Sequence, residues 1–220
     1  MAGIQLVGNA NNTTAAEVEV NTKATRVVIR PDDYGSLGIY RLGANNGASA
    51  MAAGLAAASP IYAWRSGASN VYIVKRVLFM MFSGTTGFTA GNAIFNLFAA
   101  RSFTASDTGG TGVTPTGNSN KLRTSMATTG IADARISATA TLTAGTRTLD
   151  AQPLASIVTA ISTATFTQFV NPNTVLLDQR VGEYPLVCAA NEGFEIQATV
   201  PATGVWFFAV TVDWEELASY

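Results

Sequence analysis

The chain contains no histidine, a single cysteine (Cys188) and only 12% charged residues in 220 positions. Without imidazole a Ser-His-Asp triad cannot be assembled, and metal sites lose their commonest ligand. One cysteine cannot form a disulfide within the chain, and the apolar neighbours of Cys188 predict a buried small hydrophobe. These absences argue against an enzyme, and we expect no catalytic residue, no cofactor and no metal ligand.

The charge balance is close to neutral, with a net charge of −1. No basic patch stands out, so we expect no nucleic-acid partner. The longest apolar run, Val71–Phe82, is short and is interrupted by Lys75 and Arg76, so we expect no membrane partner. Apolar residues nevertheless make up 48% of the chain, and the mean hydropathy is +0.24. So much apolar surface with so little charge predicts burial between subunits.

Three polar motifs favour structural explanations over chemical ones. Asp32 and Asp33 could bind a hard cation or act as acid and base, but their place in a turn after Arg30 favours capping and a salt bridge. The glycine-rich stretch 109–112 lacks the Gly-Lys-Ser/Thr sequence of a phosphate-binding loop and predicts a flexible loop instead. The acidic residues within 213–216 are typical of a solvated strand end or a subunit contact.

Strand patterns dominate what the sequence does contain. Residues 70–82 are β-branched and aromatic, and both faces are largely apolar, which predicts a central strand covered on both sides. Alternation within 17–20 and 25–30 predicts a hairpin near the N-terminus. Clean alternation in 193–200 and 205–214, with a turn between them, predicts a C-terminal hairpin that closes a sandwich or barrel.

Other segments give weaker signals. Residues 154–161 (LASIVTAI) are the best helix candidate, whereas 88–102 could be a strand or a short helix. Residues 137–143 alternate small apolar and hydroxyl side chains, which predicts a solvent-facing strand. Residues 104–120 predict a long loop that is functional or mobile, and 1–16 predict an N-terminal arm.

The fold class that these patterns favour is all-β: an antiparallel sandwich or jelly-roll-like barrel with long loops and at most one or two short helices. We expect an arm over 1–16 and a single β-rich domain over 17–220. The C-terminal aromatic residues are the candidates for interface area between subunits: Trp206, Phe207, Phe208, Trp214 and Tyr220.

Four stretches resemble a family of small β-rich virion proteins of tailed bacteriophages. They are 30–41 (RPDDYGSLGIYR), 51–65 (MAAGLAAASPIYAWR), 137–150 (SATATLTAGTRTLD) and 191–216 (NEGFEIQATVPATGVWFFAVTVDWEE). The last stretch is the most specific of the four. The resemblance carries over no catalytic residue and implies a structural part of a virion.

The resemblance favours a capsid decoration (cement) protein, which would form a homotrimer and pack against the major capsid protein. The alternative is a tail or head-fibre component that binds a receptor or glycan. A major coat protein fits less well, because the long charged helix of that fold is not visible. Residues 1–6 lack a charged and apolar leader, so we expect assembly into the virion in the host cytoplasm.

Overall fold

The computed structural model describes residues 37–47, 50–55, 58–84, 86–161, 169–179 and 184–218, with only the backbone described at 169–173. The chain divides into two compact units, Met1–Asp33 and Tyr34–Tyr220, and all described residues lie in the second. The expected arm 1–16, the expected hairpin within 17–30 and the pair Asp32 and Asp33 therefore lie outside the described residues.

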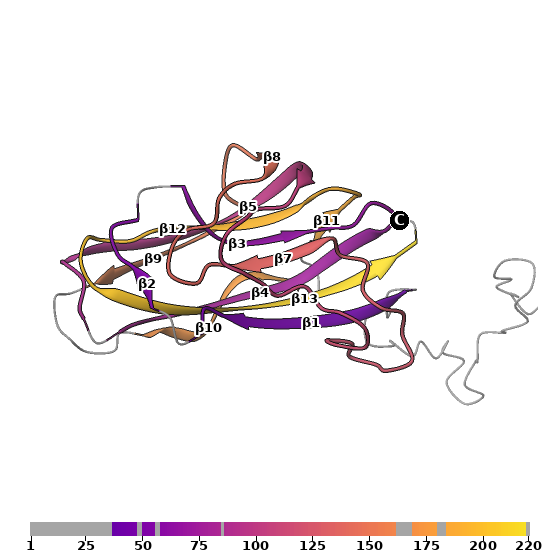
Figure 1. The fold of residues 1–220 in the computed structure, drawn as a ribbon, viewed down its shortest axis with the longest axis horizontal. Helices are drawn as coiled ribbons and strands as arrows, with labels where there is room; N and C mark the ends of the chain where they lie inside the picture. The colour runs from indigo at the N-terminus through magenta and orange to yellow at the C-terminus, as the bar shows by residue number, and fades with distance from the viewer. Residues whose placement is uncertain are drawn as a thin grey trace, which may run out of the picture. The chain divides into compact units, whose positions relative to one another are not determined.

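The described residues form two antiparallel sheets and no helix, which confirms the all-β prediction (Figure 1). The first sheet contains β1 (Gly38–Asn45), β2 (Met51–Ala52), β4 (Val71–Ser83), β10 (Phe169–Asp178), β11 (Leu186–Cys188) and β13 (Val205–Leu217). The second contains β3 (Ser59–Arg65), β5 (Gly91–Ala105), β6 (Thr111–Gly112), β7 (Asp133–Ile136), β8 (Thr146–Leu149), β9 (Ala155–Ile161) and β12 (Gly193–Thr199).

Eight of these strands form four nested antiparallel pairs: β1 with β13, β3 with β12, β4 with β10, and β5 with β9. Successive pairs fall alternately in the first and the second sheet. A long hairpin rolled up in this way has the strand order of a jelly roll. The expected sandwich is thus confirmed in its two-sheet form, and the described strands do not close into a barrel.

The core lies between the sheets, because each sheet turns alternate side chains toward the other. Trp64 of β3 stacks on Phe194 of β12 at 5.6 Å between ring centroids and meets Trp214 of β13 edge-on at 5.8 Å. Phe79 of β4 meets Phe95 of β5 at 4.5 Å. Contacts of this kind add about 0.5–1.5 kcal/mol each beyond the burial of the rings.

The prediction that residues 70–82 form a central strand is confirmed by β4, but the cover expected on both of its faces is not. It pairs with β13 on one side and with β10 and β11 on the other. Only one of its faces is buried along most of its length, however. Val77, Phe79 and Met81 point into the core, whereas Leu78, Met80 and Phe82 are half-buried on the outer face.

The C-terminal strands β12 and β13 form as predicted, but the prediction that they pair as a hairpin is wrong. β12 pairs with β3 and β5 in the second sheet, and β13 pairs with β1 and β4 in the first. Residues 201–204 cross between the sheets. Gly204 supports the crossing because its φ is +86° and a Cβ there would lie 2.8 Å from the carbonyl oxygen of Gly87.

Alternation in the sequence shows which side chains point inward, but it is compatible both with a hairpin in one sheet and with two strands in different sheets. In a hairpin, the apolar sides of the two strands would lie on one face of one sheet. In the observed crossing they face each other through the core, so that Phe194 and Ile196 of β12 and Trp206 and Phe208 of β13 are all buried. The pairing partners come from distant segments, which local alternation cannot identify.

Residues 154–161 do not form the expected helix. Residues 155–161 are β9, which pairs antiparallel with β5 along its whole length. The segment contains Ile157, Val158, Thr159 and Ile161, whose β-branched side chains favour strands. Apolar spacing in so short a run fits a helix or a strand, and the available edge of β5 decides between them.

Two further predictions are wrong in the insertion between β5 and β9, residues 106–154. Residues 137–143 are a bent segment rather than a strand, and Leu142 packs onto the outer face of the second sheet with Ala63, Ala100 and Phe103. Residues 104–120 are not one long loop, because β5 extends to Ala105 and β6 occupies 111–112. The insertion therefore builds a small second core outside the sandwich.

Adjacent phenylalanines on β13 provide a direct test of this fold. Phe208 is 1% exposed in the core, whereas Phe207 is half-buried on the outer face. We expect Phe208→Ala to lower the free energy of unfolding by about 3–5 kcal/mol and Phe207→Ala by about 1 kcal/mol, measured by urea denaturation of dilute protein. Equal losses at the two positions would contradict the assigned faces of β13.

Candidate functional site

The structure separates the predicted interface residues. Trp206, Phe208 and Trp214 are buried in the core of the chain itself, so their apolar area is used within the subunit. Phe207 points to the outer face of the first sheet and stacks on Phe82 of β4, with ring centroids 5.0 Å apart. Tyr220 lies outside the described residues. Of the described candidates, only Phe207 is placed to contact a partner.

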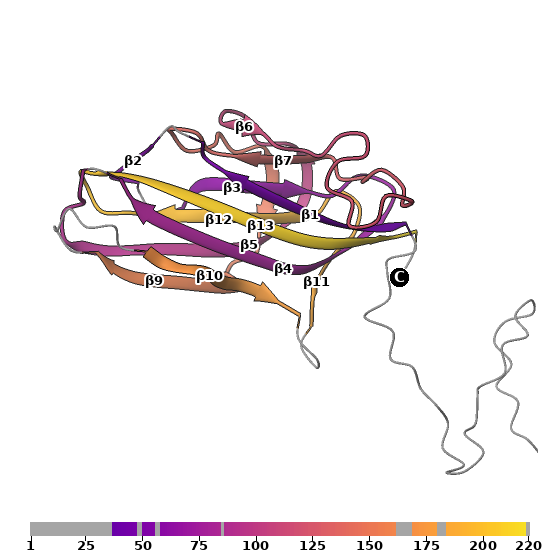
Figure 2. The same cartoon turned by 90° about the horizontal axis from the view of Figure 1, so that it is seen from below.

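Phe207 belongs to a contiguous apolar area on the outside of the first sheet, which we call the outer apolar face. It comprises Leu78, Met80, Phe82, Val175, Phe207 and Ala209. Cross-strand register brings these side chains together from three neighbouring strands, β10, β4 and β13. No described element covers these strands on this side (Figure 2).

One end of the outer apolar face is closed by charges. Asp213 of β13 accepts a two-point contact from Arg41, through Nε at 2.6 Å and Nη2 at 3.0 Å. Oδ2 of Asp213 also forms a salt bridge with Nη2 of Arg76 at 2.6 Å. The hydrogen bond to Asp213 raises the pKa of the Arg41 guanidinium, so this group stays charged. The apolar area thus ends in a fixed polar boundary.

The expectation of a solvated acidic end at 213–216 is wrong for two of its three residues. Glu215 and Glu216 are 6% and 1% exposed. Glu215 pairs with Nζ of Lys75 at 2.9 Å. Burial of a carboxylate requires donors or a counter-charge, and each of these residues has them.

Glu216 is held by four donors at the end of the sandwich. Its carboxylate accepts bonds from Trp214 Nε1 at 3.1 Å, Thr129 Oγ1 at 2.5 Å, the Gly130 backbone N–H at 2.9 Å and Asn70 Nδ2 at 3.3 Å. Donors to an ionised acceptor form bonds about twice as strong as neutral ones. Through these hydrogen bonds, the Glu216 carboxylate anchors the loop around Gly130 to the last residues of β13.

The same charge affects two tyrosines in this region. Burial, and then the negative charge of Glu216, raise the pKa of both Tyr40 and Tyr72 to about 12. Each hydroxyl donates to a loop carbonyl: Tyr40 to Ala127 at 2.9 Å and Tyr72 to Gly130 at 2.6 Å. These groups stay protonated at neutral pH and act as structural donors.

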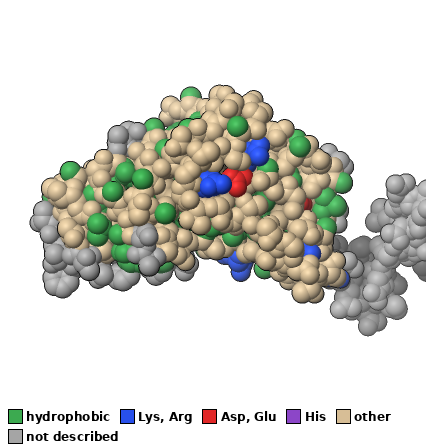
Figure 3. Space-filling model, in the orientation of Figure 1, with side chains coloured by type: hydrophobic (Ala, Val, Ile, Leu, Met, Phe, Trp, Pro, Cys, Tyr) green, Lys and Arg blue, Asp and Glu red, His purple; other side chains and the backbone are tan. Residues whose placement is uncertain are grey.

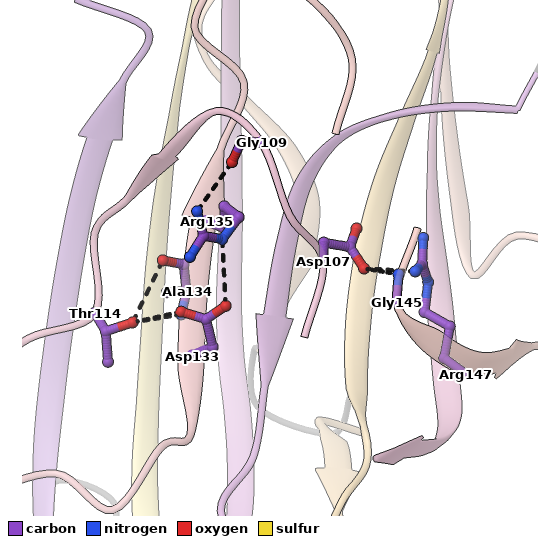
Figure 4. A network of polar contacts seen from close by, with 8 residues as sticks. All are labelled: Asp107, Gly109, Thr114, Asp133, Ala134, Arg135, Gly145 and Arg147. Carbon is purple, nitrogen blue, oxygen red and sulfur yellow. Dashed lines mark hydrogen bonds and ion pairs between the residues drawn. The ribbon is translucent and has the colours of Figure 1, made fainter. Parts of the chain in front are cut away.

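A second buried charged group lies on the outer side of the second sheet, beneath the insertion. Asp107 Oδ1 accepts bonds from the Gly145 backbone N–H at 2.9 Å and from Arg147 Nη1 at 2.5 Å (Figure 4). Nη2 of Arg147 pairs with Glu195 of β12. The Arg147 guanidinium also lies over the ring of Phe103, 5.4 Å from its centroid. We call Asp107, Arg147 and Glu195 the buried charge cluster.

Burial controls the electrostatics of this cluster. The side chains of Asp107 and Glu195 are fully buried, and that of Arg147 is 5% exposed. Loss of solvent raises the pKa of Asp107, and the Gly145 N–H and the Arg147 charge only partly offset the effect. Loss of solvent likewise lowers the pKa of Arg147. One guanidinium bridges two carboxylates, so the cluster is poorer in positive than in negative charge.

A pocket of about 210 Å³ lies beside the buried charge cluster. Glu195, Arg147 and Gln197 supply its polar wall, and the Gln197 amide donates to Glu195 Oε1 at 2.8 Å. The opposite lining is apolar and includes Pro60 and Leu149. The pocket could hold several waters or a small organic group, because one water needs roughly 10–15 Å³ of such space.

A neighbouring network fixes the start of the insertion. Thr114 Oγ1 donates to Asp133 Oδ1 at 2.9 Å, and the Arg135 guanidinium bridges Asp133 and the Gly109 carbonyl oxygen (Figure 4). The glycine-rich stretch 109–112 is therefore bonded to β7, and its β6 residues pair with that strand. The prediction of a flexible loop is therefore wrong for residues 111 and 112, which form a short paired strand.

Cys188 is fully buried in β11, as predicted. Burial, with the nearby charge of Glu192, raises the pKa of its thiol to about 12, so the reactive thiolate is suppressed. Across the described residues there is no group of three or more histidine, cysteine or acidic side chains able to hold a metal ion.

The buried charge cluster was not found from the sequence. Asp107, Arg147 and Glu195 are spread over almost ninety positions, and only the pairing of β5, β8 and β12 brings them together. One local signal existed: Glu195 and Gln197 interrupt an otherwise apolar strand at outward positions. Outward polar residues are normal on a solvated sheet, so this signal does not reveal that an insertion covers them.

A scan against protein-family models and a search of curated proteins give no match for this chain. Within the described ranges, no helix is long and apolar enough to cross a membrane.

The role of Glu216 as a fastening point can be tested by substitution. Glu216→Ala leaves four donors without their acceptor at a buried position, so we expect a loss of about 3 kcal/mol in the free energy of unfolding and faster exchange of the Gly130 amide hydrogen. Glu216→Gln keeps one acceptor oxygen and should lose less. A Glu216→Ala variant with wild-type stability and exchange would contradict this role.

Proposed function

We propose that the protein is a structural subunit of a bacteriophage virion. In this proposal it is a capsid decoration (cement) protein that self-associates, as a homotrimer, and packs on the lattice of the major capsid protein to stabilise the head. The observation that carries the proposal is the outer apolar face around Phe82 and Phe207.

The outer apolar face is costly to leave in water. Phe82, Phe207, Met80 and Leu78 adjoin one another on paired positions of two long strands, so their accessible surface is continuous rather than scattered. Contiguous apolar areas of this kind mark contact sites in soluble proteins. Each Å² removed from water stabilises an association by roughly 25 cal/mol before the costs of binding are subtracted.

Composition supports the same role. The face of the molecule in Figure 3 carries few charged side chains, and its surface is largely uncharged. A net charge of −1 over 220 residues gives little long-range repulsion between copies. Such a surface suits a subunit that is packed closely among many others.

The strand order is consistent with this role. Jelly rolls serve as coat domains in viral capsids, and they also serve as lectins and other binding proteins. Fold alone does not decide between these functions. The resemblance of four stretches of the sequence to phage virion proteins favours the first of them.

Sedimentation of the full chain tests the self-association. We expect oligomers of the wild-type protein and a monomer for Phe207→Glu, because a charge on the outer apolar face would have to be buried without a partner. Ser156→Glu adds the same charge at an exposed position of β9 and should leave the oligomer intact. A wild-type chain that stays monomeric at high concentration would contradict the proposal.

Localisation tests the virion assignment separately. In a density map of intact particles of the phage that encodes the chain, the sandwich should appear in symmetric copies on the head surface. Its presence instead in tail or head fibres, together with hits on a glycan array, would replace the decoration role with that of a receptor-binding fibre component.

A further inference from the structure

β9 is an edge strand of the second sheet. It pairs with β5 on one side along all of its seven residues, and no described strand pairs with its other side. In an antiparallel pair, alternate residues turn both their backbone N–H and their C=O away from the partner strand. The open side of β9 therefore presents a row of donors and acceptors to which a further strand could bind.

Two hydrogen bonds identify the residues that form this row. The N–H of Leu154 donates to the carbonyl oxygen of Leu97 at 2.7 Å. The N–H of Asp150 likewise donates to the carbonyl oxygen of Ala99 at 3.0 Å. Odd-numbered residues in this part of β5 thus turn their backbone groups toward β8 and β9, and the register pairs them with odd-numbered residues of β9. The residues of β9 that turn their backbone groups to the open side are therefore Ser156, Val158 and Ala160.

The sequence of β9 has none of the features that prevent pairing at an exposed edge. Natural sheets protect their edges with charged residues, prolines, bulges, short strands or covering segments. Residues 155–161 (ASIVTAI) contain no charge and no proline, and they pair with β5 without a register shift. Val158 is 60% exposed, and Leu154, just before the strand, is 47% exposed. β9 therefore offers a regular and apolar edge.

The other edge strands of the described structure are protected. The outer side of β1 is covered by residues 120–122, which form two backbone hydrogen bonds with it, at 3.0 and 3.1 Å. β10 contains Pro172 and has two register shifts against β4. β2, β6, β8 and β11 are only two to four residues long. Among the described strands, β9 is thus the one long edge without such protection.

The chemistry of this edge selects the kind of partner. A row of alternating donors and acceptors matches the backbone of an extended polypeptide, which binds by adding a strand to the sheet. The exposed side chains of Val158 and Leu154 favour apolar side chains on the added strand. Residues 155–161 offer no counter-charge to a charged side chain, so an uncharged strand fits best.

We infer that the open edge of β9 is a strand-addition site for an extended, uncharged segment of a partner protein, with β-branched or aromatic side chains at alternate positions. A second copy of this chain fits less well. β10 adjoins β9 (Figure 2), so pairing between two β9 strands would also bring together the two irregular β10 strands. A single extended segment avoids this conflict. The site belongs to the second sheet and is independent of the virion proposal, which uses the first.

Amide hydrogen exchange of the full chain, followed by NMR, tests the site. The probes are three peptides of the form Thr-Xaa-Thr-Xaa-Thr-Xaa-Thr, where Xaa is Val, Ile or Phe, with a lysine at each end for solubility. We expect at least one of them to slow exchange of the Val158 amide by about tenfold or more, in a saturable manner, because its backbone would accept a hydrogen bond from that N–H. No saturable protection with any of the three would overturn the inference.

A matched peptide separates strand addition from unspecific apolar binding. N-methylation of the three central residues of the binding peptide keeps its side chains but removes the backbone donors along both of its edges. This peptide should give no protection of the Val158 amide. Protection equal to that by the unmethylated peptide would contradict strand addition and overturn the inference.

Variants of Val158 test the same point from the side of the protein. Val158→Pro removes a donor from the open edge, where proline is tolerated because that N–H is not needed for pairing with β5. It should abolish protection of the Ala160 amide by the peptide, whereas Val158→Thr keeps the donor and should preserve it. Protection retained in Val158→Pro, or lost equally in both variants, would overturn the inference. If Val158→Pro does not fold, the N-methylated peptide decides the question.

Pairing with a second copy is tested without any peptide. In Phe207→Glu, where the outer apolar face carries a charge, exchange of the Val158 amide should not depend on protein concentration. Protection that rises with concentration would show that β9 pairs with itself and would overturn the assignment to a partner protein. Sedimentation tests the virion proposal through Phe207, so failure of one proposal can be told from failure of the other.

Discussion

At the two ends of β13, a tryptophan joins the first sheet to the second. Trp214 meets Trp64 edge-on at 5.8 Å, and Trp206 meets Phe95 at the same distance between centroids. Between them Phe208 and the valines of β13 face inward, and β1 and β4 pair on its two sides. Nested pairing places this last strand beside the first, so the sandwich depends on the inward face of β13.

The same strand carries part of the apolar surface that the proposed self-association would use. Side chains alternate along a strand, so the outward side chains of β13 can be polar while its inward side chains are apolar. At one end of β13 the outward side chain is polar: Asp213 binds Arg41 and Arg76. At the other end Phe207 and Ala209 continue the apolar surface of β4. Those outward residues add less to the stability of the subunit than the buried face does, and our proposal assigns them to contacts between subunits.

Local pattern was sufficient for the longest strands, but not for the shorter ones or for the pairing partners. The alternation of 205–214 places Trp206, Phe208 and Trp214 on one face, and the structure buries them together. The hairpin expected with 193–200 was wrong because pairing depends on β1, β3, β4 and β5, which are distant in the sequence. The helix expected at 154–161 failed for a related reason: a free edge of β5 was available to a β-branched segment.

Buried polar residues were the least predictable feature. Glu216 was expected to be solvated, yet a loop from 129–130 wraps it with donors. Asp107 gave no signal in a stretch that resembles an open loop, and its carboxylate is bonded by Gly145 and Arg147 from a later segment of the chain. A polar residue in a sequence is exposed to solvent only when no other segment of the chain covers it. Long-range packing determines whether such a segment is present.

The neighbouring methionines of β4 give the most direct measurement of the central claim, because Met80 lies in the outer apolar face and Met81 is 2% exposed in the core. Peroxide oxidation followed by mass spectrometry should modify Met80 in dilute protein, spare it in concentrated, associated protein, and spare Met81 in both. Oxidation of Met80 at the same rate at all concentrations would contradict burial of that face between subunits, and oxidation of Met81 as fast as Met80 would contradict the fold itself.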